Sequence, residues 1–332
     1  MDDLFADALR QLLLDQCPPQ LVRAIEAGGS AEPFWKQLEA SGFADAMLGE
    51  EQGGAGLALP DAFALLELCG AHAVPVPLAQ TMLARALLAR AGLAPVPGSI
   101  TFALDATGAD GAIRCPLVSY GRVANWVLLA HGDACLLLPV AGAEVKPAVF
   151  ALDADLSWSA AEVDAARRLA AVPDLRTLQA CVCAAQLSGA LMSVFTRTLQ
   201  FANERSQFGR PIGKFQAIQH QLSVISEHTF AARMAAQIGC HCAGDTPERL
   251  RVAVAKARTS EAALEVAALS HSIHGAIGFT AEFDLQLYTR RLHAWRQSAG
   301  SESYWHTVLG EELVDRQQGL ALDLVRATSD MN

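Results

Sequence analysis

The segment from residue 205 to residue 216 holds the side chains whose types and spacing are best suited to chemistry. It reads Arg205-Ser206-Gln207-Phe208-Gly209-Arg210-Pro211-Ile212-Gly213-Lys214-Phe215-Gln216. A loop arginine supplies a fixed positive charge that suits a pyrophosphate, Phe208 offers a flat apolar face, and Gln216 can hydrogen-bond the edge of a base. The alternative is a capped interhelical turn with an incidental arginine.

Other parts of the sequence do not indicate a nucleophile or a metal site. There is no G-x-S-x-G elbow, no P-loop and no G-x-G-x-x-G after an expected strand. His271 and His274 stand three residues apart at a helix end, and His241 lies between two cysteines, but no carboxylate completes a ligand set. These histidines are expected to be structural, and no metal is expected.

Composition limits the class of protein. The 332 residues include 25 Lys+Arg and 35 Asp+Glu, for a net charge of −10, and 52% are hydrophobic. Such a chain can bury a large core, and without a basic cluster it is not expected to bind nucleic acid. No secretory signal and no apolar run of about 18 residues is found, so no membrane span is expected. The eight cysteines lack C-x-x-C spacing, which favours buried reduced thiols and a cytoplasmic location.

Periodicity divides the chain into three expected domains: helical residues 1–95, a β domain over 96–164 and a helical bundle over 165–332. The fold class is therefore mainly α with a small β middle domain. Short apolar runs predict strands at 99–104, 115–121, 125–130, 134–140 and 147–153. Longer patterns, bounded by Pro and Gly, predict bundle helices at 173–203, 212–243, 247–273, 283–294 and 302–327.

Three segments together resemble the acyl-CoA dehydrogenase family. Residues 205–216 are similar to its signature R-x-Q-F-G-x-x-[IL]-x-x-x-Q, residues 48–57 to its P-E-x-x-G-G-x-G turn, and residues 274–283 to its G-G-x-G-[FY]-x-x-E-[FY] stretch. The resemblance implies an N-terminal helical domain, a β-barrel here reduced in size, and a C-terminal four-helix bundle. It also implies FAD as cofactor and an acyl-CoA thioester as substrate.

In that family, the loop containing the signature reaches across a dimer interface to the FAD of the neighbouring subunit. The resemblance assigns cofactor contacts to ten positions of this chain: Arg205, Gln207, Phe208, Ile212, Phe215, Gln216, Ser272, Gly275, Ala276 and Ser301.

The catalytic base of the family is missing from this sequence. A family carboxylate removes the α-proton as hydride leaves the β-carbon for the flavin. The commoner of its two positions falls on Ala299 and the alternative on Gln179, and neither a methyl nor an amide takes up that proton. Glu302 is the nearest substitute, although an acid in the first turn of a helix also fits the helix dipole.

The middle domain is also shortened, since the strands with which the family holds its own flavin match poorly here. With its missing base and its shortened middle domain, the chain resembles the short subunit of heteromeric acyl-CoA dehydrogenases from bacterial steroid-type catabolism. A longer family member would complete an α2β2 tetramer and bury the apolar face over residues 187–199, with electron-transferring flavoprotein a possible acceptor. Two alternatives stay open: a self-sufficient homo-oligomeric dehydrogenase with an unusual base, and a catalytically dead structural or regulatory family member.

Overall fold

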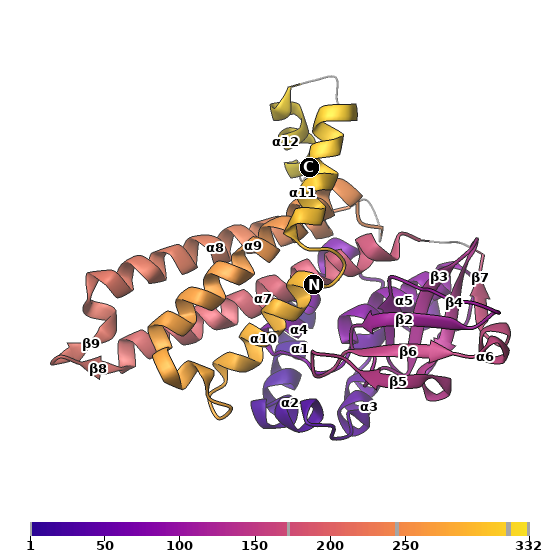
Figure 1. Ribbon diagram of the computed structural model, residues 1–332, viewed down its shortest axis with the longest axis horizontal. Helices are drawn as coiled ribbons and strands as arrows, with labels where there is room; N and C mark the ends of the chain where they lie inside the picture. The colour runs from indigo at the N-terminus through magenta and orange to yellow at the C-terminus, as the bar shows by residue number, and fades with distance from the viewer. Residues whose placement is uncertain (1, 171–172, 243–245, 317–319, 331–332) are drawn as a thin grey trace. The chain divides into compact units, whose positions relative to one another are not determined.

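The computed structural model describes residues 2–170, 173–242, 246–316 and 320–330 (Figure 1). The chain forms two compact units, one of residues 1–65 and 74–179 and the other of residues 66–73 and 180–332. Helix α4 (Leu59–Ala71) begins in the first unit and ends in the second. The predicted division into three domains at residues 95 and 164 stays a prediction.

Helices make up the N-terminal part of the first unit, as expected. They are α1 (Asp2–Gln16), α2 (Pro19–Glu26), α3 (Glu32–Ala40) and α5 (Leu78–Arg90), together with the start of α4. Leu9 and Leu13 of α1 are four residues apart and fully buried, whereas Leu14 is exposed, so one stripe of this helix faces the core. Gly53, at φ +86°, ends the short 3-10 turn before α4.

Two small sheets complete the first unit. The first has the order β1 (Ile100–Ala103), β3 (Trp126–His131), β4 (Ala134–Pro139) and β7 (Arg167–Leu169), and only its β1–β3 pair is parallel. The second has the order β2 (Ile113–Val118), β6 (Ala154–Trp158) and β5 (Glu144–Pro147). Side chains from both sheets share one hydrophobic core, with Trp158 and Leu136 fully buried and Val163 of α6 (Ala160–Asp164) packed on it.

The expected strand at 147–153 is wrong. Strand β5 ends at Pro147 and β6 begins at Ala154, and between them the chain turns back with a hydrogen bond from the Ala148 N–H to the Asp153 carbonyl. Val149 in this turn is 93% exposed. The run is apolar in composition, but two antiparallel strands need these residues to reverse direction, so hydrophobicity alone misplaced the strand.

The second unit is a helical bundle with a small hairpin. Its helices are α7 (Leu175–Glu204), which enters this unit at Ala180, α8 (Gln216–Cys240), α9 (Arg249–His274), α10 (Leu285–Gln297), α11 (Glu302–Glu311) and α12 (Ala321–Ser329). Between α7 and α8, β8 (Ser206–Gln207) and β9 (Arg210–Pro211) form the hairpin. Figure 1 shows the hairpin at one end of α8 and α9 and α11 at the other end of α9.

The single helix expected over 302–327 is also wrong. Helix α11 stops at Glu311, a π-helical segment follows over Glu312–Arg316, and α12 starts only after Leu320, whose backbone is extended. Periodicity predicted one continuous helix here because apolar side chains continue on both sides of the break.

The apolar face over residues 187–199, which was expected to be buried by another subunit, is covered in part within the chain, while Leu199 is 38% exposed. Leu187, Leu191 and Val194 are fully buried, because α4 packs closely on α7. A Cβ added at Gly189 would lie 1.9 Å from the Glu67 carbonyl oxygen, so only glycine permits this approach. The long apolar helix α7 meets the length and composition of a membrane span, but 83% of its most apolar window is buried inside the protein.

The cysteines agree in part with the expectation of buried thiols. Seven of the eight are buried and unbridged, while Cys242 is partly exposed. Burial raises the pKa of Cys135 to about 11, so this thiol stays protonated and unreactive at neutral pH.

Candidate functional site

The tip of the β8–β9 hairpin presents Phe208 to solvent. Ser206 pairs with Pro211 and Gln207 with Arg210, so Phe208 and Gly209 form a two-residue turn. Their φ angles are +53° and +82°, the left-handed conformation that such a turn requires. A non-glycine residue pays about 1 kcal/mol for this conformation, yet Phe208 is 90% exposed and recovers little by packing. Strain of this kind is typical of functional positions.

The base of the hairpin is held by the other residues of the signature segment. Ile212 is buried, and its N–H donates to the Arg205 carbonyl at 2.8 Å. The ring of Phe215 lies edge-on to that of Phe208 and beneath the guanidinium of Arg210, whose Cζ is 4.3 Å from the ring centroid. Of the predicted cofactor contacts in this segment, Ile212 is buried and Phe215 is partly buried. The other four, Arg205, Gln207, Phe208 and Gln216, are exposed.

The end of α9 lies beside this hairpin. Phe201 of α7 stacks on His274 at 4.3 Å, and Gln221 of α8 reaches the Ser272 hydroxyl at 3.4 Å. Helix α9 ends at Gly275, whose φ of +63° starts the 3-10 turn Gly275–Phe279. The structure therefore brings Ser272, Gly275 and Ala276 to the same end of the bundle as the signature segment.

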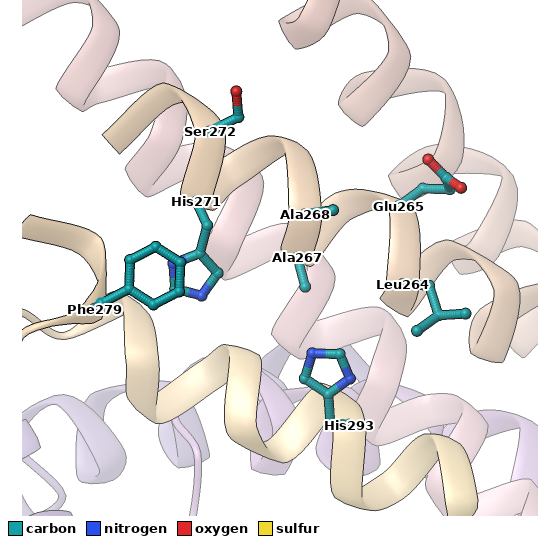
Figure 2. A pocket seen from close by; sticks show the side chains of 8 residues that line it. All are labelled: Leu264, Glu265, Ala267, Ala268, His271, Ser272, Phe279 and His293. Atoms are coloured by element: carbon teal, nitrogen blue, oxygen red, sulfur yellow. The ribbon is translucent and has the colours of Figure 1, made fainter. Parts of the chain in front are cut away.

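A groove of about 600 Å³ opens between α9, this 3-10 turn and α10. Figure 2 shows the ring of His271 against that of Phe279, and His293 reaching from α10 toward α9. The lining is mostly apolar with a few hydrogen-bonding groups, which is the usual character of a ligand pocket. It consists of Leu264, Glu265, Ala267, Ala268, His271, Ser272, Phe279 and His293.

Burial favours the neutral form of two histidines at this end of the bundle, His271 and His274. Burial, followed by the nearby His274 and His293, lowers the pKa of His271, whose Nε2 lies 3.0 Å from the Thr289 hydroxyl. Burial also lowers the pKa of His274, whose Nδ1–H donates to the Ser270 carbonyl at 2.8 Å. Within the described residues, no group of three His, Cys, Asp or Glu side chains could hold a metal ion.

The predicted base position lies in the turn between α10 and α11. Ala299 is buried with φ +59°, and its carbonyl accepts from the Trp305 indole at 3.0 Å. The neighbouring Gly300 carbonyl accepts from Lys256 at 2.8 Å. Gln179, at the alternative position, is a buried amide on α7. Neither position carries a group that takes a proton at neutral pH.

Glu302 is poorly suited to replace the base. Burial alone would raise its pKa, but a hydrogen bond and charge from Arg296, with the charge of Lys256, together lower it. A carboxylate with a lowered pKa is a weaker base. Its pairing with Arg296 and its place in the first turn of α11 fit a structural role.

The predicted cofactor residues fall into two separate groups. Ser301 occupies the residue before α11, in the turn bound by Lys256, whereas Ser272 follows Lys256 by sixteen residues on α9. Sixteen residues span about 24 Å along an α-helix. The turn with Ala299 and Ser301 and the hairpin end with Arg205 therefore lie near opposite ends of α9.

Sequence reasoning missed the burial of Lys256 and the position of Arg210. Lys256 stands in an alanine-rich run between Arg251 and Arg258, where nothing in the sequence distinguishes it as a buried residue or shows what it binds. Arg210 lies within the signature segment. A two-residue turn predicted at Phe208-Gly209 would have indicated that Arg210 pairs with Gln207.

Comparison with known proteins decides the family. Residues 177–313 match the family model described as "Acyl-CoA dehydrogenase, C-terminal domain". Over 304 residues the chain is 31% identical to acyl-CoA dehydrogenase IpdE2 of Mycolicibacterium smegmatis, covering 90% of this chain and 94% of that protein. The chain belongs to the acyl-CoA dehydrogenase family.

Solved structures agree with this assignment. The steroid acyl-CoA dehydrogenase Tcur3481-Tcur3483 (a G363A variant) matches with a TM-score of 0.80 and 26% identity, over 93% of this chain and 96% of the matched chain. The ChsE4-ChsE5 complex of Mycobacterium tuberculosis matches with a TM-score of 0.82 over 95% and 98%. At 23% identity the second likeness shows the fold, which is the expected family fold, mainly helical with small sheets.

Proposed function

We propose that this chain is the base-lacking subunit of a cytoplasmic heteromeric acyl-CoA dehydrogenase and completes the FAD site of a longer partner subunit. The observation that carries the proposal is the pair of base positions occupied by Ala299 and Gln179, with Glu302 bound to Arg296. A chain that keeps the cofactor loop but has no base is suited to contribute to a site whose base lies elsewhere.

The residues at the hairpin end fit a flavin dinucleotide. FAD is the cofactor of this family, and its pyrophosphate suits the exposed guanidinium of Arg205. Helix α8 begins without a side-chain cap and with no acid in its first turn, so its N-terminal N–H groups also favour an anion. A Cβ added at Gly275 would meet no atom within 4 Å, which leaves this stretch of backbone open to a ligand.

When bound, FAD supplies the hydride acceptor for α,β-dehydrogenation of an acyl-CoA thioester. This chain would bind and orient the cofactor: Arg205 neutralises phosphate charge, Gln207 hydrogen-bonds, and Phe208 excludes water with its exposed ring. The proton removed from the substrate would go to a carboxylate of the partner.

Two of the similar structures support a two-chain assembly, since each contains two differently named proteins, ChsE4 with ChsE5 and Tcur3481 with Tcur3483. We extend this to an α2β2 arrangement. The description of the second as a steroid enzyme supports a steroid-type acyl-CoA as the substrate class. Electron-transferring flavoprotein would be the electron acceptor.

The first experiment is to purify the chain alone and together with a co-expressed longer acyl-CoA dehydrogenase, and to record visible absorption spectra. We expect a colourless lone chain and a flavin band in the assembly that is bleached by acyl-CoA. A stoichiometric flavin band bleached in the lone chain would contradict the proposal and favour the self-sufficient enzyme. Absence of flavin from every assembly would favour a structural or regulatory family member.

The matched variants are Arg205→Met, which removes the charge proposed to bind phosphate, and Lys146→Met, which removes an exposed charge from β5 in the first unit. We expect Arg205→Met to lower the flavin content of the assembly and Lys146→Met to leave it unchanged. Equal flavin content in both variants would show that the hairpin does not bind the cofactor.

A further inference from the structure

The hairpin end carries positive charges without carboxylate partners. Arg205, Arg210 and Lys214 form no ion pair within the described parts of the chain. Several arginines elsewhere are paired with carboxylates, as Arg233 is with Glu67 and Arg296 with Glu302. In a chain of net charge −10, unneutralised cations at one place create a local site for an anion.

Backbone pairing decides which of these cations act together. Side chains alternate between the two faces of a β-ribbon, and directly opposed residues share a face. Gln207 and Arg210 are directly opposed, and Arg205 lies two residues before Gln207, with its carbonyl bonded to Ile212 on the other strand. Arg205, Gln207 and Arg210 therefore lie on one face, while Ser206 and Pro211 lie on the other.

The guanidinium of Arg210 is held in place on this face. It lies over the ring of Phe215, with Cζ 4.3 Å from the centroid, and this ring is itself supported edge-on by Phe208. Stacking fixes the plane of a guanidinium while leaving its N–H groups free to donate to an oxyanion. A flexible surface arginine would lose more conformational entropy on binding.

We propose that Arg210 is a second phosphate-binding residue, which together with Arg205 clamps the two phosphates of a dinucleotide. This inference rests on the proposed function, because it names a further residue of the same site. A pyrophosphate bears a negative charge on each phosphate, and Arg205 supplies only one cation. Diagonal neighbours on a ribbon face are about 7–8 Å apart, within reach of two arginine side chains that approach one ligand.

The test measures the affinity of the isolated full-length chain for inorganic pyrophosphate. Binding is monitored by NMR through the backbone amide signals, at several salt concentrations. Arg210→Met keeps the apolar stem but removes the charge. We expect it to weaken binding by about tenfold to a hundredfold, the effect of one charge-assisted hydrogen bond. The salt dependence of the remaining affinity should also decrease, because one cation fewer contacts the ligand.

Two further variants separate a specific contact from general electrostatics. Lys214→Met removes an equally unpaired charge from the next turn, and we expect less than about a threefold loss, since a non-contacting surface charge is screened. Phe215→Leu keeps the Arg210 charge but removes its platform, so affinity should fall while the salt dependence stays unchanged. Equal losses of pyrophosphate affinity in Arg210→Met and Lys214→Met would overturn the proposal. The absence of pyrophosphate binding by the unaltered chain would also overturn it.

A second measurement, FAD affinity of the co-expressed assembly, distinguishes this inference from the proposed function. An assembly without flavin, combined with the expected pyrophosphate results, would overturn the proposed function and leave the anion clamp standing. An assembly whose FAD affinity is the same with Arg210→Met as without it would overturn the clamp and leave the proposed function standing.

Discussion

Phe208 has a strained backbone conformation although its side chain is exposed. Its φ of +53° is unfavourable for a side chain with a Cβ, and its ring is 90% exposed. We predict that Phe208→Gly leaves the free energy of unfolding unchanged or raises it by up to about 1 kcal/mol, because glycine adopts this conformation without strain. We also expect the flavin content of the assembly to fall.

The control for this prediction is Asp110→Gly in the first unit, where φ is +54°. Thermal unfolding should show a similar change in stability, while flavin content should not change. A Phe208→Gly variant that retains all its flavin would show that the strained ring has no part in cofactor binding.

Lys256 gives a residue-scale prediction of pH dependence. It is fully buried and donates to the Ser260 hydroxyl and to the carbonyls of Arg296 and Gly300 at 3.0, 2.9 and 2.8 Å. Burial lowers its pKa from 10.5 to about 8. Between these values the unfolded chain binds a proton that the folded chain does not, so stability contributed by this group rises with pH through this window.

The contribution of Lys256 to the free energy of unfolding is expected to rise by about 3 kcal/mol between pH 8 and 10.5. It should be seen as the difference between the denaturant unfolding curves of the unaltered chain and Lys256→Met, which lacks the titrating group. A difference that is independent of pH across this range would contradict a lowered pKa of Lys256. Lys36→Met, at an exposed ion pair with Glu32, is the control.

At the scale of elements, the contact between α4 and α7 depends on glycine. A Cβ added at Gly70 would lie 1.8 Å from the Gln186 carbonyl oxygen, and one at Gly189 would lie 1.9 Å from that of Glu67. Backbone cannot move aside as a side chain does, so we predict that Gly70→Ala or Gly189→Ala lowers the free energy of unfolding by about 3 kcal/mol.

Gly310→Ala in α11 is the matched control, because an added Cβ there meets nothing within 4 Å. Alanine is the better helix former, so this variant should be more stable by up to about 1 kcal/mol. Chemical denaturation of the three variants tests both the expected loss of stability in Gly70→Ala and Gly189→Ala and the expected gain in Gly310→Ala. If Gly189→Ala is as stable as the unaltered chain, the helices are not as close as the structure places them.

At the scale of the whole molecule, the proposed function predicts what restoring a base would do. Ala299→Glu returns a carboxylate to the commoner family position, but the chain would still need a partner to hold flavin. We expect no bleaching by acyl-CoA when this variant is purified alone, measured by visible absorption. Activity of the lone variant would show that a complete flavin and thioester site was already present.

The matched variant Ala299→Gln has nearly the same volume without a base. Because Ala299 is buried, both substitutions are expected to lower stability, and the pair separates that effect from chemistry. Folding of both variants is checked by circular dichroism before the spectra are compared.

Sequence alone determined the features that depend on local pattern. The signature segment around Phe208, the helical periodicity of α7 to α10 and the missing carboxylate at Ala299 can all be read from residue types and spacing. Periodicity failed at residues 147–153 and in the last helix, because an apolar run does not reveal where an antiparallel chain must reverse or where a helix is interrupted.

Tertiary structure decided everything that depends on contacts between residues distant in the chain. Burial of the face around Leu191, the three hydrogen bonds of Lys256 and the separation of Ser301 from Ser272 arise from helix packing. Pairing across the hairpin placed Arg210 opposite Gln207, on the same face as Arg205. A sequence records which groups are available, whereas burial and hydrogen-bond partners, which determine pKa and binding, exist only once the chain has folded.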